Sequence, residues 1–200
     1  MAKGSGRYRR SRLDQLRRHL LFFLPDPPLS KLSYSDQELD STRAYVVLAH
    51  AEIEAFCEEL VLHKAQSAKV VYDNSGNVRP ALRRMVAYYV AKNGRSWNDV
   101  LNPPSDVVSK AFQSFQTAIR ENNGVKQVNL EKLLFPLGVL DAHLSVTWLA
   151  QMDSFGRNRG GWAHKSVRAL NSPDPLSELM NVNQLLRGLL DLDRILSRLR

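Results

Sequence analysis

Apolar residues recur at three- and four-residue spacing along most of the chain, and no segment sustains the alternation of apolar and polar residues that marks a half-buried strand. A spacing of three and four residues brings apolar side chains to one face of an α-helix, where they can be buried together. The pattern therefore predicts an all-α protein, an up-and-down helical bundle with short connections.

Capping residues, prolines and glycines mark where the predicted helices begin and end. Ser35-Asp-Gln-Glu38 is a capping box that opens a long helix ending near Tyr72. Pro80 suits the first turn of the next helix, which runs to Gly94. Three other predicted helices cover residues 8–24, the region of 108–119, and 130–135. A further helix begins at Asp141 or Ser145 and contains Trp148 as a core residue, and the last helix follows Pro175.

Length and composition fit one globular domain: the chain has 200 residues, of which 44% are apolar and 24% charged. The single cysteine, Cys57, excludes an internal disulfide and hence a secreted cystine scaffold. The longest purely apolar run near the start, residues 20–24, is shorter than a signal peptide or a membrane span requires. We expect a cytoplasmic protein that does not enter a membrane.

Positive charge is concentrated at the start of the chain. The net charge is +8, and residues 1–18 carry seven basic residues against Asp14 alone, so the rest of the chain is nearly neutral. We interpret residues 1–8 as a flexible basic arm and residues 9–200 as a single helical domain. A basic arm suits a polyanion, because each neutralised phosphate releases counterions, and the alternative is a solubilising tail. The residues expected to bind RNA are Arg7, Arg9, Arg10, Arg12, Arg17, Arg18, Lys165 and Arg168.

The motifs of several enzyme classes are missing. The sequence has no Gly-rich loop of nucleotide-binding spacing, no His-Glu-x-x-His and no Glu-x-x-His pair, which excludes kinase, GTPase and metalloprotease functions, and no metal or cofactor is expected. His50 and Glu54 form an i, i+4 pair beside the buried stripe of the long helix. We interpret the pair as a local polar contact and keep both residues as candidates for a supporting role.

Residues 157–164, Arg-Asn-Arg-Gly-Gly-Trp-Ala-His, gather two guanidinium groups, an amide and an imidazole within eight residues. On a continuous helix Arg157 and His164 share a face within about 20°, whereas Arg159 and His164 diverge by about 140°. The glycine pair Gly160-Gly161 predicts a bend or bulge that would change these angles. Arg157 and His164 could contact one phosphodiester, and the alternative is a solvated helix end with a capping histidine.

An Arg followed by a polar residue and, shortly after, by a His resembles the signature of the HEPN superfamily, in which four to six residues separate the Arg from the His. Arg157, Asn158 and His164 supply these residues here. Residues 43–56 are similar to the Leu-His-Ala, Glu, Phe run in the second helix of the group called RiboL-PSP-HEPN. Residues 130–139 resemble the short helix and Leu-Gly turn that precede the final motif of that group.

This resemblance implies a HEPN-like helical bundle, usually dimeric, and for many members a metal-independent endoribonuclease of a toxin, antiphage or other conflict system. His164 would then be the general acid or base, Arg157 would hold the nonbridging phosphate oxygens, and Asn158 would orient the histidine or the ribose. The partners it implies are RNA, a second copy of the chain, and an antitoxin or other regulatory protein.

Two departures from the family pattern leave alternatives open. Closer relatives often read Arg-Asn-x-x-Ala-His-Gly, whereas here five residues separate Asn158 from His164, and Lys165 follows in place of the glycine. Arg159, with four residues between it and His164, is therefore a rival to Arg157 as the catalytic arginine.

A second hypothesis for the function is a catalytically inactive HEPN-like module that binds RNA, a nucleotide or a protein. A third is an unrelated helical adaptor.

Overall fold

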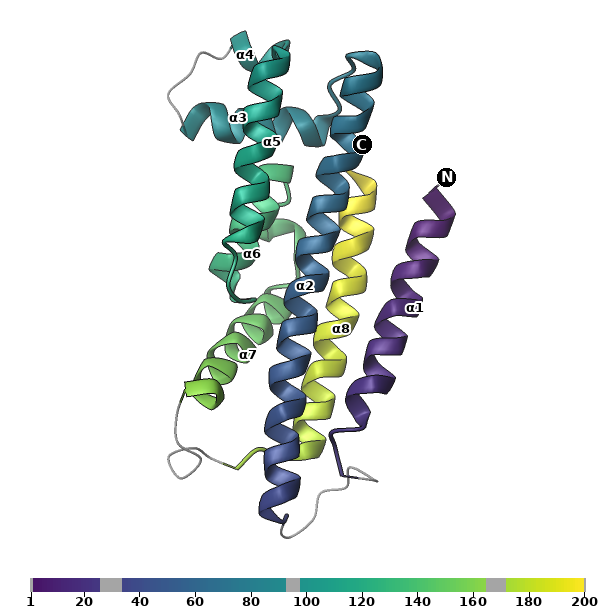
Figure 1. The fold of residues 1–200 in the computed structure, drawn as a ribbon, viewed down its shortest axis with the longest axis vertical. Helices are drawn as coiled ribbons and strands as arrows, with labels where there is room; N and C mark the ends of the chain where they lie inside the picture. The colour runs from purple at the N-terminus through teal and green to yellow at the C-terminus, as the bar shows by residue number, and fades with distance from the viewer. Residues whose placement is uncertain (1, 26–33, 93–97, 165–171, 200) are drawn as a thin grey trace. The chain divides into compact units, whose positions relative to one another are not determined.

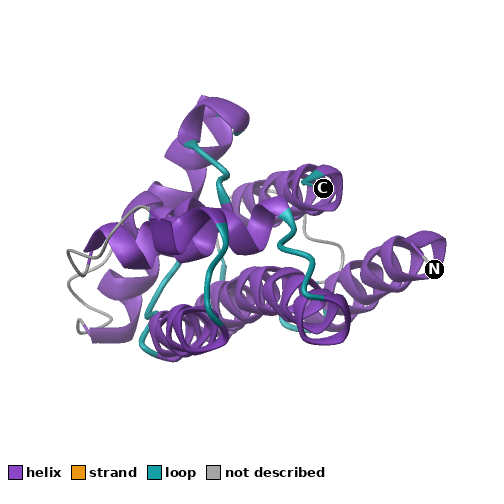
Figure 2. Ribbon diagram, turned by 90° about the horizontal axis from the view of Figure 1, so that it is seen from above, coloured by secondary structure: helices purple, strands orange, loops and turns teal. Residues whose placement is uncertain are grey.

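The computed structural model describes residues 2–25, 34–92, 98–164 and 172–199, and all regular structure in these ranges is helical (Figure 1, Figure 2). The elements are α1 (Ala2–Leu21), α2 (Asp36–Ser75), α3 (Pro80–Lys92), α4 (Asn98–Leu101), α5 (Ser105–Arg120), α6 (Gln127–Leu134), the 3-10 turns η1 (Phe135–Leu137) and η2 (Asp141–His143), α7 (Val146–His164) and α8 (Pro175–Arg198). The predicted all-α fold class is confirmed. Within the same ranges no helix has the length and apolarity needed to cross a membrane.

The predicted capping box opens α2. The backbone N–H of Ser35 donates to Glu38 Oε2 at 2.9 Å, and the backbone N–H of Glu38 donates to Ser35 Oγ at 3.3 Å. At the other end the helix runs three residues past the predicted Tyr72, to Ser75, and stops at Gly76, whose φ is +68°. A left-handed residue of this kind ends a helix at little cost only when it is glycine.

The first helix differs from its prediction at both ends. In place of a flexible arm over residues 1–8 and a helix over 8–24, α1 begins at Ala2 and ends at Leu21. Leu13 and Leu20 anchor the helix by burial. Once such a nucleus exists, each further residue adds one backbone hydrogen bond, so the helix extends through the basic residues to Ala2.

Internal contacts divide the chain into two compact units. The first consists of Met1–Glu54, Gly124–Lys126 and Val146–Asp191, and the second of Ala55–Asn123, Gln127–Ser145 and Leu192–Arg200. The first unit contains α1, α7 and the larger part of α8, and the second contains α3 to α6. Helices α2 and α8 contribute to both. A single domain over residues 9–200 stays a prediction.

Each unit has its own buried side chains. In the first, Trp148 is buried as predicted, and its indole N–H donates to the carbonyl oxygen of Leu185 at 3.1 Å. In the second, α3 packs against α5 and η1, with Met85 and Phe115 fully buried. The first unit holds the α7 segment with the candidate catalytic residues, so its packing decides how that segment is presented.

A substitution at Gly188 on α8 can test how α8 packs against Trp148 in the first unit. A Cβ at this position would overlap the rigid indole ring of Trp148. Alanine favours a helix over glycine by about 1 kcal/mol, and overpacking a core costs about 1–3 kcal/mol. We expect Gly188→Ala to lower the free energy of unfolding by about 1 kcal/mol, as measured by urea denaturation. In a Trp148→Phe background the same change should cost less, because the ring is smaller. An equal cost in both backgrounds would contradict the proposed overlap.

Candidate active site

The α7 helix carries the Arg157–His164 segment without interruption. Residues 146–164 are α-helical throughout, so the bend or bulge predicted at Gly160-Gly161 was wrong. Each glycine weakens a helix interior by about 1 kcal/mol, which is too little to end a helix that is already nucleated by the buried residues Trp148, Met152 and Phe155. On this continuous helix positions 157 and 164 lie on one side, about 20° and about 10 Å apart along the axis.

The buried face of α7 fixes which residues point outward. Its inner stripe follows steps of four, three and four residues, through the buried Trp148, Met152 and Phe155 to the half-buried Arg159. Positions 153, 157 and 164 fall within about 40° of one another on the opposite side. The two candidate arginines therefore have different surroundings.

Arg157 lies at the surface, with 59% of its side chain exposed. Its Nη1 is paired with the carboxylate of Asp153, and Nη2 donates to Ser154 Oγ at 3.2 Å. A surface pair spaced i, i+4 contributes only about 0.5 kcal/mol, so an incoming phosphate can compete for this guanidinium. Asn158 is also exposed.

Arg159 lies toward His50 on α2. The Nε of Arg159 is buried and has no hydrogen-bond partner among the residues that the structure describes. The imidazole of His50 stacks on the ring of Phe155, with centroids 5.9 Å apart and planes at 27°. Burial, and secondarily the positive charge of Arg159, lowers the pKa of His50 to about 4. His50 is therefore neutral at pH 7 and is a poor proton donor there.

The predicted pair of His50 and Glu54 is present as a close approach. His50 Nδ1 lies 3.7 Å from Glu54 Oε2, which is too long for a hydrogen bond. The Glu54 carboxylate also accepts the backbone N–H of Gly124. With 17% of its side chain exposed, Glu54 is held near the core, and it ties the segment before α6 to α2 inside the first unit.

The other predicted site residues are only partly within the described structure. His164 is the last residue of α7, but its side chain, and all of Lys165 and Arg168, lie outside the described residues. Arg7, Arg9 and Arg10 lie on α1, and their side chains are likewise outside. Arg12 is half-buried, and Arg17 and Arg18 are exposed. Positions 7, 10, 17 and 18 fall within about 100° of one another on α1, and position 17 lies within about 60° of both Leu13 and Leu20.

In the described part of the chain, no three His, Cys, Asp or Glu side chains are grouped as a metal ion would require. The arrangement offers guanidinium groups and a helix-terminal histidine position, which is the chemistry of phosphate binding and proton transfer.

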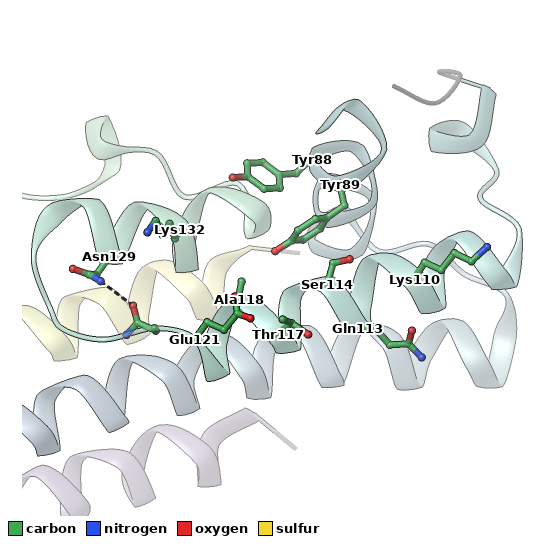
Figure 3. Close-up of a pocket in the computed structure, with 11 residues that line it drawn as sticks. Tyr88, Tyr89, Lys110, Gln113, Ser114, Thr117, Ala118, Glu121, Asn129 and Lys132 are labelled. Carbon is green, nitrogen blue, oxygen red and sulfur yellow. Dashed lines mark hydrogen bonds between the residues drawn. The ribbon is translucent and has the colours of Figure 1, made fainter. Parts of the chain in front are cut away.

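A pocket in the second unit was not predicted from the sequence. It has a volume of about 740 Å³ and lies between α3, α5 and α6 (Figure 3). Adjacent tyrosines on α3, Tyr88 and Tyr89, lie over a polar stripe of α5. The stripe, with its steps of three and four residues, is visible in the sequence. The sequence does not show that α3 would cover this stripe of α5, because the contact between the two helices joins segments that are far apart along the chain.

The family model described as RiboL-PSP-HEPN matches residues 9–189. The matched range contains the His50 region of α2 and the whole of α7. No curated protein and no solved structure matches the chain. The family assignment therefore rests on most of the chain rather than on the Arg-to-His segment alone.

The lowered pKa of His50 predicts how the free energy of unfolding depends on pH. The pKa is about 4 in the folded protein and near 6.5 in the unfolded chain, so the unfolded chain binds this proton first as pH falls. The stabilisation is complete above about pH 6.5 and is lost progressively toward pH 4. We expect wild type to lose about 2 kcal/mol more than His50→Gln between pH 7 and pH 4.5 in urea denaturation. Parallel losses in the two proteins would show that His50 titrates normally.

Proposed function

The chain belongs to the RiboL-PSP-HEPN family, and from that membership we propose that it is a metal-independent endoribonuclease of a toxin, antiphage or other conflict system. The observation that carries the proposal is the outward side of α7, where an exposed Arg157 and the position of His164 share one side of a continuous helix within the matched range. Arginine and histidine on one side of a helix can bind one phosphodiester and move its protons.

RNA supplies its own nucleophile, so this chemistry needs no metal. The 2′-oxygen attacks the adjacent phosphorus, the O2′–P bond forms, and the bond from phosphorus to the 5′-oxygen breaks. His164 takes the proton of the 2′-OH as general base or gives a proton to the leaving 5′-oxygen as general acid. Arg157 binds the nonbridging oxygens and offsets the charge that develops on them, and Asn158 orients the ribose or the histidine.

The packing of α7 supports Arg157 over Arg159 in the phosphate role. Arg157 is exposed, and its contacts are a surface pair with Asp153 and a hydrogen bond to Ser154 Oγ. The Nε of Arg159 is buried, and its charge acts on His50 within the first unit. In the proposed enzyme Arg159, His50 and Glu54 are positioning residues: His50 stacks on Phe155 of α7, the charge of Arg159 acts on His50, and Glu54 lies beside His50 on α2.

Residues on α1 are proposed to hold the RNA backbone. Positions 7, 10, 17 and 18 form a basic side of this helix, with Arg17 and Arg18 exposed. Such a row attracts phosphates without reading the sequence of bases, and its contribution falls with rising salt. Lys165 and Arg168 would add charge next to the catalytic segment.

We further propose that the enzyme is a cytoplasmic homodimer with an antitoxin or other regulatory protein as partner. One imidazole is either base or acid at a given moment, whereas the reaction uses both. A second copy related by a two-fold axis would supply the complementary His164.

A catalytically inactive HEPN-type module that binds RNA, a nucleotide or a protein is the second candidate. The extra residues between Asn158 and His164 and the lysine at position 165 favour it, because both depart from the spacing and sequence of the family motif.

Alanine variants of the three motif residues distinguish the two candidates. We expect His164→Ala and Arg157→Ala each to lower the rate of RNA cleavage by about 100-fold or more, with melting temperatures close to wild type, because both groups act on the reacting phosphate. Arg159→Ala should cost less than tenfold. Arg187→Ala, an exposed arginine on α8, is the matched control and should leave the rate unchanged. Full activity of His164→Ala would rule out its catalytic role, and a loss confined to Arg159→Ala would transfer the phosphate role to Arg159.

Metal independence is tested on the wild-type protein. Cleavage should proceed at the same rate in excess EDTA and leave a 2′,3′-cyclic phosphate or its 3′-phosphate hydrolysis product, because attack by the 2′-OH forms that ring. Mass spectrometry of the product ends checks this. A requirement for Mg²⁺, or cleavage of DNA, which lacks the 2′-OH, would contradict the mechanism.

A further inference from the structure

The pocket between α3, α5 and α6 lies wholly within the second unit, whereas α7 with Arg157 belongs to the first. Its floor is the polar stripe of α5 that extends from Lys110 to Glu121. The eleven steps from residue 110 to residue 121 span about 16 Å, so the pocket is an elongated groove rather than a hole for one small ion.

Two tyrosines from α3 form one wall of the groove. Tyr88 and Tyr89 meet edge to face, with ring centroids 5.1 Å apart and planes at 81°. Tyr89 is buried, and burial, then its neighbour Tyr88, raises its pKa to about 12, so it stays a neutral phenol. Tyr88 is 36% exposed and offers ring surface at the groove (Figure 3). The buried ring of Tyr89 therefore packs against the exposed ring of Tyr88 and restricts its orientation.

Two cationic side chains lie along the groove on different helices. Lys110 comes from α5 and Lys132 from α6. Lys110 approaches Asp106 at 3.5 Å, but both side chains are 61% exposed, so this pair is weak. Glu121, the one acidic residue in the lining, can accept hydrogen bonds from the amino group of a base.

The end of the groove near α6 is held by hydrogen bonds within the second unit. Asn129 Nδ2 donates to Asn122 Oδ1 at 3.3 Å, and Asn122 Nδ2 donates to Glu58 Oε1 at 2.9 Å. This chain of amides fixes the start of α6, and therefore Lys132, relative to α5. The lining is thus held by contacts that do not depend on an occupant.

We propose that this groove binds nucleotides of a single-stranded RNA, with a base stacked on Tyr88 and phosphates near Lys110 and Lys132. A flat aromatic surface with separated cations fits a ligand that repeats a flat ring and an anionic group. A simple anion would not stack on the tyrosine ring, and a neutral sugar would not be attracted by the charge of the lysines. The inference rests on the proposed function in taking RNA as the ligand, and it adds a second contact region for that substrate.

The test measures binding of a fluorescein-labelled 2′-O-methyl oligoribonucleotide by anisotropy, since this strand has no 2′-OH and is not cleaved. Tyr88→Ala should raise Kd about tenfold, because base stacking on an aromatic side chain contributes about 1.4 kcal/mol or more and that amount is tenfold. Tyr88→Phe keeps the ring and should stay within about twofold of wild type. Arg83→Ala, exposed on the same helix outside the groove, is the matched control.

The lysine variants test the phosphate contacts. Lys110→Ala and Lys132→Ala should each weaken binding and reduce the slope of log Kd against log salt by about 0.7. Wild-type affinity in both Tyr88→Ala and Lys132→Ala would overturn the proposal. Competition by AMP at concentrations equal to the oligonucleotide would also overturn it, and would identify a free nucleotide as the ligand.

Photo-crosslinking keeps the test independent of how the variants fold. A strand that carries 5-iodouridine should attach to Tyr88 in the wild-type protein, as located by mass spectrometry of peptides, and crosslinks found only elsewhere would overturn the proposal. The proposal on RNA binding in the groove and the proposal on RNA cleavage can fail independently of each other. If RNA is cleaved but Tyr88→Ala binds normally, only this groove assignment is wrong. If the groove binds RNA and nothing is cleaved, the endoribonuclease proposal is wrong and the groove assignment stands.

Discussion

The packing of one face of α7 determines how the candidate site is presented. The buried residues Trp148, Met152 and Phe155 fix the rotation of the helix, and the i, i+3 and i+4 geometry then assigns every other position. Arg159 is directed inward to the neutral His50, and Arg157 outward to solvent. A register shift of one residue in the packed stripe would rotate the two arginines by about 100° and remove this distinction, whereas a bulge at the glycine pair would rotate position 164 away from Arg157. The proposed chemistry therefore depends on apolar packing more than on any polar contact.

Local signals allowed much of the fold to be predicted from sequence. The capping box at Ser35 and the prolines at 80 and 175 mark helix starts within one residue, because each acts through atoms of its own turn. Two predictions were wrong, the ends of the first helix and the bend at Gly160-Gly161, because helix propagation and packing decide them rather than the residues of one turn. Residues before Leu13 extend α1 because a packed helix propagates, and Gly160-Gly161 stays helical because the buried residues up to Phe155 have already nucleated α7.

Contacts between distant segments account for what the sequence could not supply. The pairing of His50 with Glu54 followed from their spacing, but the stacking of His50 on Phe155 and the influence of Arg159 join residues more than a hundred positions apart. The same is true of the groove in the second unit, which is lined by Tyr88 and Tyr89 of α3 and by a polar stripe of α5. A resemblance to a family identified the catalytic segment, and only the packing separated its two arginines.

In the proposed mechanism Arg157 and His164 act on the same phosphate as one unit. The most direct test is a double-mutant cycle on kcat/KM for RNA cleavage, with Arg157→Ala, His164→Ala and the double variant measured beside wild type. Groups that stabilise one transition state together lose nearly all of their effect when either is removed. If the two residues act together, the double variant is no slower than the slower single variant. Losses that multiply in the double variant, or a wild-type rate in Arg157→Ala, would contradict it.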